Sequence, residues 1–158
     1  DDIPRLAQLG IVASIQPGHA PIGHIFPAGA VGQYLHPHQI SGAYAWQTIR
    51  ASGARVVFST DWPVIPVDVM PNIRAAIDPL DLGPEWTDQT QSLHDTLASY
   101  TRDNAWVEFA ENRRGRLAVG MQADVAVMDR DLFALDPAQI VDAKAAATIC
   151  AGRVTYEA

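Results

Sequence analysis

Residues 54–66, A-R-V-V-F-S-T-D-W-P-V-I-P, decide how the fold of this chain is interpreted. The apolar run at 56–58 has the size of a strand buried on both faces, which is typical of the parallel sheet of an α/β domain. Pro63 prevents the strand from continuing, and Asp61 places a carboxylate just after its carboxyl end. Barrels of α/β type keep their catalytic groups at that end of their strands. Asp61 equally suits the start of an Asp-Trp-Pro turn, and the local sequence leaves both interpretations open.

A second strand is predicted earlier in the chain. Pro4 suits the first turn of a short helix capped by Asp2, and Gly10 ends that helix. Residues 11–16 then form an apolar strand that runs into Gln16-Pro17-Gly18-His19. A helix, a tight turn and a buried strand in this order make up half of a βα repeat, so the fold class is predicted to be α/β.

The rest of the chain divides into an α/β body and a smaller β-rich tail. Residues 20–37 are rich in Gly and Pro and are predicted to form a long loop of the kind that usually has a function. Helices are expected over 39–52 and over 92–109, the second with a capping box formed by Ser92 and Asp95. The segment between 66 and 91 is interpreted as irregular. Short strands are predicted at 124–129 and on both sides of a turn within 147–156.

Composition excludes several functional classes. The chain has 158 residues, 48% of them hydrophobic, and a formal net charge of −7, which argues against a nucleic-acid-binding surface. Its single cysteine, Cys150, excludes an internal disulfide framework and a cysteine-based zinc site. No apolar run has the length of a membrane span and no signal peptide is visible, so we expect a cytoplasmic location. Because the sequence starts at Asp1 and almost at once enters a helix, we expect it to be the carboxyl part of a longer protein.

His19 follows one predicted strand as Asp61 follows the other. If the two strands are neighbours in one parallel barrel, the imidazole and the carboxylate face the same opening. A histidine and an aspartate there are half of a divalent metal site, and the carboxylate can also transfer protons. The alternative for His19 is a loop histidine that hydrogen-bonds a backbone carbonyl.

Other polar and aromatic residues are assigned more limited roles. His36-Pro37-His38 has no apolar strand before it and contains a proline, so we interpret it as a turn that precedes a helix. His24, in the long loop, and Trp62, beside Asp61, are candidates for lining a substrate pocket.

Several segments, taken together, resemble the carboxyl half of the amidohydrolase superfamily, in the large branch that includes N-substituted formamide deformylases. The segments are D-D-I-P-R-L-A-Q-L-G-I-V-A-S-I-Q-P-G-H-A (1–20), G-A-Y-A-W-Q-T-I-R-A-S-G-A-R-V-V-F-S-T-D-W-P-V (42–64), L-A-S-Y-T-R-D-N-A (97–105), and G-R-L-A-V-G-M-Q-A-D-V-A-V-M-D (115–129) with T-I-C-A-G-R-V-T-Y (148–156). Their order and spacing also resemble those of the family, and together they extend over nearly the whole chain.

This resemblance implies part of a distorted (β/α)8 TIM-type barrel at 1–113 and carboxyl-terminal strands of a small β-sandwich at 114–158. It implies one or two divalent ions, usually Zn2+, at the barrel opening. Asp61 matches the acid after the last barrel strand, which binds metal and acts as general base. His19 matches the histidine after the sixth strand, which often binds metal.

The implied reaction is hydrolysis of a non-peptide carbon–nitrogen bond in a small-molecule amide or N-substituted formamide. A metal-activated water, deprotonated by Asp61, would attack the carbonyl carbon. Two alternatives stay open: a catalytically silent domain that binds a ligand or partner through the same opening, and deaminase or cyclic-amidase chemistry on the same scaffold.

The sequence departs from the family pattern in places. Ser59-Thr60 replaces the Gly-Ser that precedes the acid, and both substituted residues are small. The His-x-His of the first strand, and the middle-strand carboxylate or modified lysine with its following histidine, are missing and would lie upstream of Asp1. We therefore expect the chain to need the missing amino-terminal half of the barrel as its partner for catalysis, with a homo-oligomer left open and neither nucleic acid nor membrane as a partner.

Overall fold

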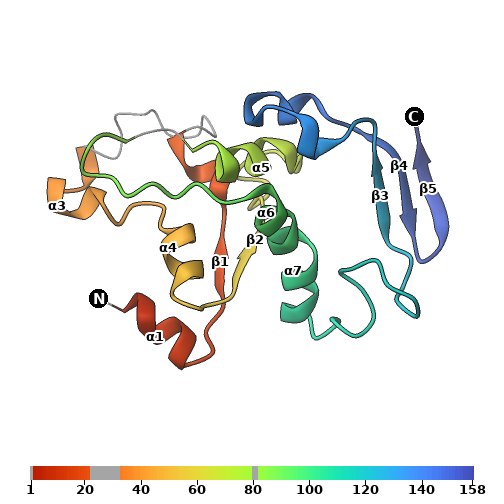
Figure 1. The fold of residues 1–158 in the computed structure, drawn as a ribbon, viewed down its shortest axis with the longest axis horizontal. Helices are drawn as coiled ribbons and strands as arrows, with labels where there is room; N and C mark the ends of the chain where they lie inside the picture. The colour runs from red at the N-terminus through yellow and green to blue at the C-terminus, as the bar shows by residue number, and fades with distance from the viewer. Residues whose placement is uncertain (1, 22–32, 80–81) are drawn as a thin grey trace.

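A computed structural model describes residues 2–21, 33–79 and 82–158 of the chain. Figure 1 shows a two-stranded sheet with most of the helices around it and a three-stranded sheet at the carboxyl-terminal side. Helices and strands therefore both contribute, as the α/β prediction requires. None of the helices in the described ranges has the length and apolar character needed to cross a lipid bilayer.

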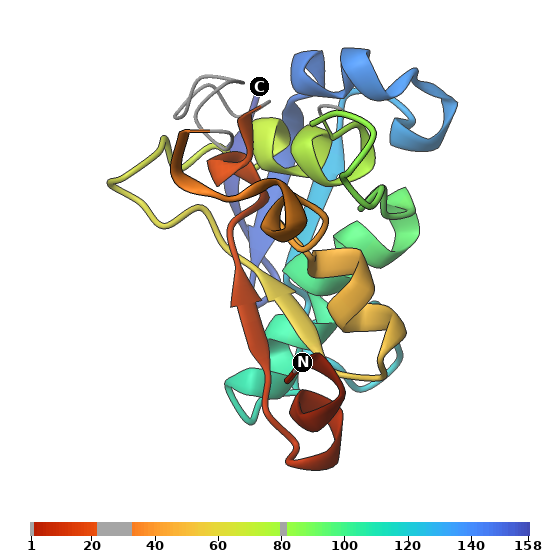
Figure 2. The same cartoon turned by 90° about the vertical axis from the view of Figure 1, so that its left-hand side faces the viewer.

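The two-stranded sheet consists of β1 (Ala13–Ile15) and β2 (Val56–Phe58), which run parallel. They are paired in register from Ala13 opposite Val56 to Ile15 opposite Phe58, and Figure 2 shows them side by side. All residues of β2 are buried, which confirms the predicted buried strand. β1 is only partly buried, because the described residues supply no strand on its other side.

The prediction of one continuous helix over 39–52 is wrong. The structure has α3 (Pro37–Ile40) and α4 (Trp46–Ala51), separated by a turn. Tyr44 lies in that turn with a positive φ of 53°, a left-handed conformation that an α-helix does not accommodate. The first helix, α1 (Ile3–Gln8), lies where it was predicted, but the Asp2 side chain makes no capping hydrogen bond and pairs with Arg5.

The helix predicted over 92–109 is also interrupted. It forms α6 (Leu93–Tyr100) and α7 (Arg102–Val107), and the break lies at Thr101, whose φ and ψ are −121° and −86°. The Thr101 hydroxyl donates to the Leu97 carbonyl at 2.7 Å, which gives the backbone an alternative to continuing the helix. The predicted cap is confirmed, since the Ser92 hydroxyl accepts from the Asp95 amide at 3.0 Å.

The segment interpreted as irregular contains a helix, α5 (Met70–Ile77). Pro71 lies in its first turn, where proline is tolerated because the first amides of a helix have no partner within it. Asp68, two residues before the helix, accepts from the Met70 amide at 3.0 Å. Proline here marks a helix start and not an interruption.

Two hydrophobic clusters hold these elements together. The first surrounds β2 and contains Trp46, Val56 and Phe58. The second joins α5 to the carboxyl-terminal region through Met70, Ile73, Ile140 and Ala143. The Tyr100 ring packs against both clusters, so α6 connects the body to the tail.

The tail forms a three-stranded antiparallel sheet in the order β3 (Val125–Met128), β4 (Ala145–Cys150), β5 (Arg153–Glu157). Two 3-10 turns, η3 (Leu132–Ala134) and η4 (Pro137–Asp142), connect β3 to β4. The predicted turn at Ala151-Gly152 is confirmed, with φ of 50° and 78°, as a tight two-residue hairpin requires. All residues of β5 are exposed.

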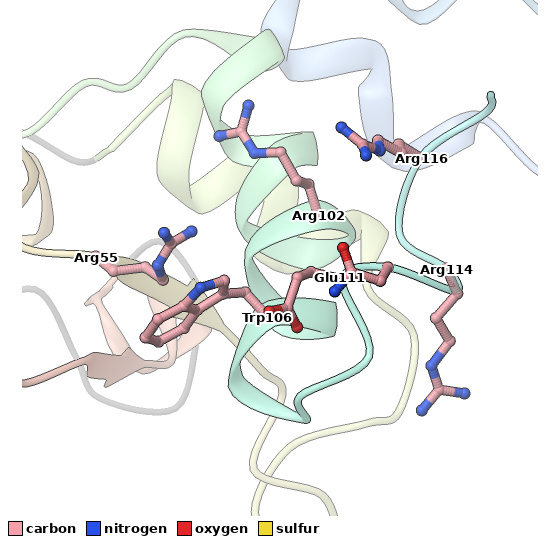
Figure 3. Close-up of a pocket in the computed structure, with 7 residues that line it drawn as sticks. Arg55, Arg102, Trp106, Glu111, Arg114 and Arg116 are labelled. Atoms are coloured by element: carbon pink, nitrogen blue, oxygen red, sulfur yellow. The ribbon is translucent and has the colours of Figure 1, made fainter. Parts of the chain in front are cut away.

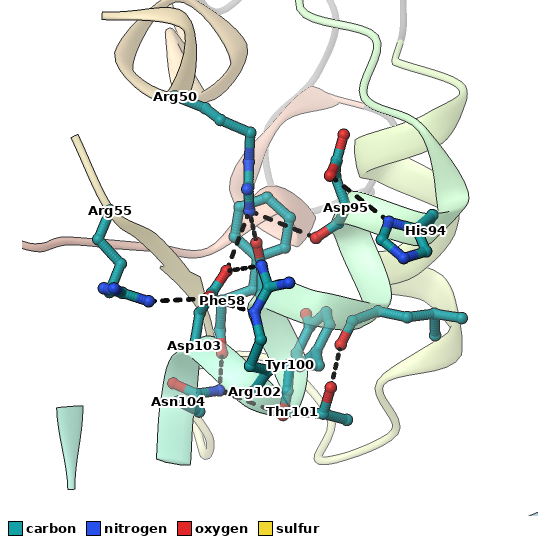
Figure 4. Close-up of polar contacts among 12 residues, drawn as sticks. Arg50, Arg55, Phe58, His94, Asp95, Tyr100, Thr101, Arg102, Asp103 and Asn104 are labelled. Carbon is teal, nitrogen blue, oxygen red and sulfur yellow. Dashed lines mark hydrogen bonds and ion pairs between the residues drawn. The ribbon is translucent and has the colours of Figure 1, made fainter. Parts of the chain in front are cut away.

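A buried carboxylate anchors α7 against the amino end of β2 (Figure 4). The side chain of Asp103 is only 3% exposed, and it accepts from Arg55 Nη1 at 2.9 Å and from Arg102 Nε at 3.1 Å. Arg50 Nη2 from α4 lies 3.5 Å from the other carboxylate oxygen. The hydrogen bond to Asp103 raises the pKa of the Arg102 guanidinium. Asp103 thus links α4, β2 and α7.

We predict that Asp103→Asn destabilises the protein by about 2 kcal/mol, because three arginines lose their shared counter-charge while remaining partly buried. The free energy of unfolding from chemical denaturation of the full-length protein measures the effect. Asp2→Asn is the matched control, since Asp2 pairs with Arg5 on the surface and its loss is expected to leave stability unchanged. Equal stability of the two variants would contradict the anchoring role of Asp103.

Candidate active site

The carboxyl ends of β1 and β2 lie next to each other, because paired parallel strands end at the same edge of a sheet. The Ser59 amide extends the pairing by donating to the Ile15 carbonyl at 3.1 Å. Beyond this point the first strand turns into η1 (Pro17–His19), and the second reaches Asp61. The parallel arrangement therefore brings the chain segments that carry His19 and Asp61 to one place.

His19 and Asp61 face each other there. Nε2 of His19 lies 3.5 Å from Oδ2 of Asp61, and the two side chains are 26% and 49% exposed. The Asp61 side chain is thus the more accessible of the two. Among the described residues, the Asp61 carboxylate accepts no hydrogen bond.

The buried nitrogen of His19 is short of a partner. Nε2 is inaccessible to solvent and makes no hydrogen bond within the described residues. This observation speaks against a loop histidine that is satisfied through Nε2 by a carbonyl. Two ligands bound at about 2.1 Å to a tetrahedral zinc ion stand roughly 3.4 Å apart, so the observed separation of nitrogen and oxygen fits two ligands of one cation.

Asp61 is also part of a turn. Its carbonyl accepts from the Val64 amide at 2.8 Å, and its φ of 59° is left-handed, which aspartate tolerates better than most residues. The turn predicted at Asp61 is therefore confirmed, and within this turn the side chain faces His19.

Neighbouring side chains hold the two segments in place. Gln16 Nε2 donates to the Ser59 hydroxyl at 3.0 Å and so ties one strand end to the other. The Gly18 amide donates to Oδ1 of Asn72, a residue of α5 that is 1% exposed, at 2.8 Å. A Cβ at Gly18 would lie 2.6 Å from that oxygen and 2.6 Å from Ile65 Cδ1. A larger residue before His19 would therefore force Asn72 or Ile65 to move.

Sequence reasoning did not identify these supporting residues. Asn72 escaped notice because its helix was interpreted as irregular chain. For Gly18 a signal was present, since a Pro-Gly pair directly before a candidate ligand indicates a backbone that other groups approach closely.

The remaining predicted residues are less closely connected to the pair. Trp62 is 68% exposed next to Asp61 in the chain. His24 lies outside the described residues. His36 directly precedes α3 as predicted, whereas Pro37 and His38 belong to the helix itself, and the His36 and His38 rings stack with centroids 5.7 Å apart.

The pair does not form a full metal site by itself. Within the described ranges, no group of three or more His, Cys, Asp or Glu side chains is placed to hold a metal ion. Structural and catalytic zinc sites use three or four protein ligands, so any ion held here needs further ligands from other residues.

Comparison with known proteins gives similar relatives in bacteria and plants. The chain is 29% identical to the putative amidohydrolase YtcJ of Bacillus subtilis, over 98% of this chain and 30% of YtcJ. It is 28% identical to the protein LONG AFTER FAR-RED 3 of Arabidopsis thaliana, over 96% of this chain and 26% of that protein. The chain thus spans less than a third of the length of these relatives.

The chain is also similar to parts of solved structures. An uncharacterized metal-dependent hydrolase from Pyrococcus horikoshii is similar with a TM-score of 0.73 and 27% identity, over 87% of this chain and 28% of that one. An amidohydrolase from Thermotoga maritima shares the fold at 18% identity, with a TM-score of 0.66, over 99% of this chain and 34% of that one.

The family assignment rests on a match that includes nearly every residue. The model of the amidohydrolase family matches residues 1–156, a range that contains β1, β2 and most of the tail sheet. The chain belongs to the amidohydrolase family.

Proposed function

We propose that this chain is the carboxyl-side portion of a metal-dependent hydrolase that acts on non-peptide carbon–nitrogen bonds, with a small-molecule amide or N-substituted formamide as substrate. The observation that carries the proposal is the 3.5 Å approach of His19 Nε2 to Asp61 Oδ2 at the shared end of two parallel strands. Family membership and the similarity to solved structures of uncharacterized metal-dependent hydrolases support it.

In this proposal, residues 1–113 form part of a (β/α)8 barrel and residues 114–158 part of a β-sandwich. The parallel pairing of β1 with β2 supports a barrel segment. Each of these strands has a second edge that pairs with no strand of the described residues, and unpaired edges favour further strand addition. The remaining barrel strands would come from the rest of the polypeptide.

The donor set suits a divalent ion such as Zn2+, which accepts both imidazole nitrogen and carboxylate oxygen. His19 would bind it through Nε2, the buried nitrogen without a partner, and Asp61 through its carboxylate. The ion, when bound, would act as a Lewis acid toward the substrate carbonyl and make a coordinated water more acidic. Further ligands, and the choice between one ion and two, depend on residues outside this chain.

The protein's own groups would position the reactants and move protons. Asp61 would accept a proton from the attacking water and then deliver it to the departing amine nitrogen. The left-handed turn at Asp61 aims its carboxylate at His19 while half of the side chain stays accessible. Trp62, exposed next to this acid, and His24 would contact the substrate.

We predict that Asp61→Asn lowers the turnover number of the full-length protein on N-substituted amides and formamides by at least about 100-fold, because the amide side chain cannot serve as general base. Metal content and steady-state kinetics of the zinc-reconstituted protein provide the measurement. Asp142→Asn, which makes the same change at an exposed site, is the control and is expected to retain wild-type rates.

Two results would contradict the proposal. Full activity of Asp61→Asn would show that Asp61 is not the general base. A wild-type protein without bound metal after zinc reconstitution would favour a catalytically silent binding domain. Turnover of amines or cyclic amides in place of open-chain amides would redirect the proposal to deaminase or cyclic-amidase chemistry.

We further predict that Gly18→Ala weakens zinc binding about tenfold, because the new methyl group displaces Asn72 or Ile65 and with them the turn that orients His19. Competition with a chromogenic chelator measures the affinity of the full-length protein. Gly42→Ala is the matched control, since its added Cβ meets only Gln39 O at an ordinary 3.7 Å. Equal zinc affinity in both variants would show that the Gly18 packing does not position His19.

A further inference from the structure

Basic residues gather at the opposite end of β2 from His19 and Asp61. Six of the 11 Lys and Arg residues in this acidic chain lie in α4, immediately before β2, in α7 or in the segment that follows α7. They are Arg50, Arg55, Arg102, Arg113, Arg114 and Arg116. A local excess of positive charge in a protein with a net charge of −7 calls for a specific explanation.

A pocket of about 350 Å³ opens among these residues (Figure 3). Its walls come from the start of β2, from α7 and from the segment that follows α7. The lining residues are Arg55, Arg102, Trp106, Glu111, Asn112, Arg114 and Arg116. This volume lies near the lower limit of small-molecule sites, which span about 300–1,000 Å³.

The carboxylates nearby do not neutralise the arginines. Asp103 is shared by Arg50, Arg55 and Arg102, and Glu108 pairs with Arg114. Arg116 lines the pocket without a hydrogen bond or ion pair to any described residue. Counting Glu111 in the wall and Asp95, whose charge also acts on Arg102, five guanidinium groups meet four carboxylates, which leaves an excess of one positive charge.

The arginines are held in fixed positions around this excess charge. The Arg55 guanidinium lies 4.2 Å from the centroid of the Trp106 ring while it also bonds to Asp103, so its orientation is fixed twice. Arg102 is fixed by the same carboxylate. In Figure 3, Arg114 extends away from Arg102 and Arg116, toward its own carboxylate partner. Arg102 and Arg116 therefore remain as the groups best able to bind an incoming anion.

We propose that this pocket is a binding site for a small molecule that carries a phosphate or a similar multivalent oxyanion. Guanidinium groups bind such oxyanions through paired, charge-assisted hydrogen bonds. The fixed Arg102 and the uncompensated Arg116 supply the donors, and the exposed part of the Trp106 ring supplies a flat apolar surface beside them. The site is independent of the proposed hydrolase activity, because it uses none of the residues assigned to that activity.

The test is calorimetric titration of the full-length protein with sodium phosphate, at an ionic strength held constant with sodium chloride so that general screening does not change. We expect saturable binding in wild type and an approximately tenfold higher dissociation constant in Arg116→Gln, which loses a charge-assisted contact. Arg153→Gln removes the same charge from exposed β5 and is expected to bind phosphate as wild type does.

The Asp61→Asn variant distinguishes phosphate bound in this pocket from phosphate bound to a metal ion at His19. We expect this variant to bind phosphate as wild type does. The proposal is overturned if phosphate binding is absent or unsaturable, if Arg116→Gln and Arg153→Gln lose affinity equally, or if Asp61→Asn abolishes the binding. Near-ultraviolet circular dichroism of Arg116→Gln verifies that the loss of binding occurs in a folded protein.

Discussion

The parallel pairing of β1 with β2 is the constraint on which the rest of the structure depends. Backbone hydrogen bonds hold Ile15 opposite Phe58, so the segments that leave the two strands emerge at one edge. A shift of the register by one residue would turn every side chain of a strand to the other face and separate the groups that follow. The burial of all of β2 makes such a shift costly, since it would expose part of the first hydrophobic cluster.

The two ends of β2 have different chemistry for this reason. At the carboxyl end, hydrogen bonds from Gln16 and Gly18 support a histidine and an aspartate that face each other with a buried nitrogen unsatisfied. At the amino end, Asp103 organises a group of arginines against α7. The side-chain amide of Asn104, also in α7, donates to the carbonyl of Phe58 at the carboxyl end of β2, at 3.0 Å. A short buried strand thus has a histidine–aspartate pair after one end and a group of arginines at the other.

Elements with strong local signals were predictable from sequence. The run at 56–58, the cap at Ser92 and the Ala151-Gly152 turn each carry their own physical cause, and all three occur as expected. Interruptions of helices were not predicted, because neither the left-handed backbone of Tyr44 nor the local bond from the Thr101 hydroxyl to the Leu97 carbonyl interrupts the helical spacing of the apolar residues. The proximity of His19 to Asp61 could be proposed from two strand ends. The hydrogen bond from the Gly18 amide to Asn72, which supports this arrangement, could not be predicted, since it joins segments far apart in the chain.

Anomalous X-ray diffraction from crystals of the full-length protein grown with zinc tests the central claim most directly. The account predicts a zinc peak within about 2.3 Å of both His19 Nε2 and an oxygen of Asp61. A zinc ion bound elsewhere, with His19 Nε2 hydrogen-bonded to a protein carbonyl, would contradict it.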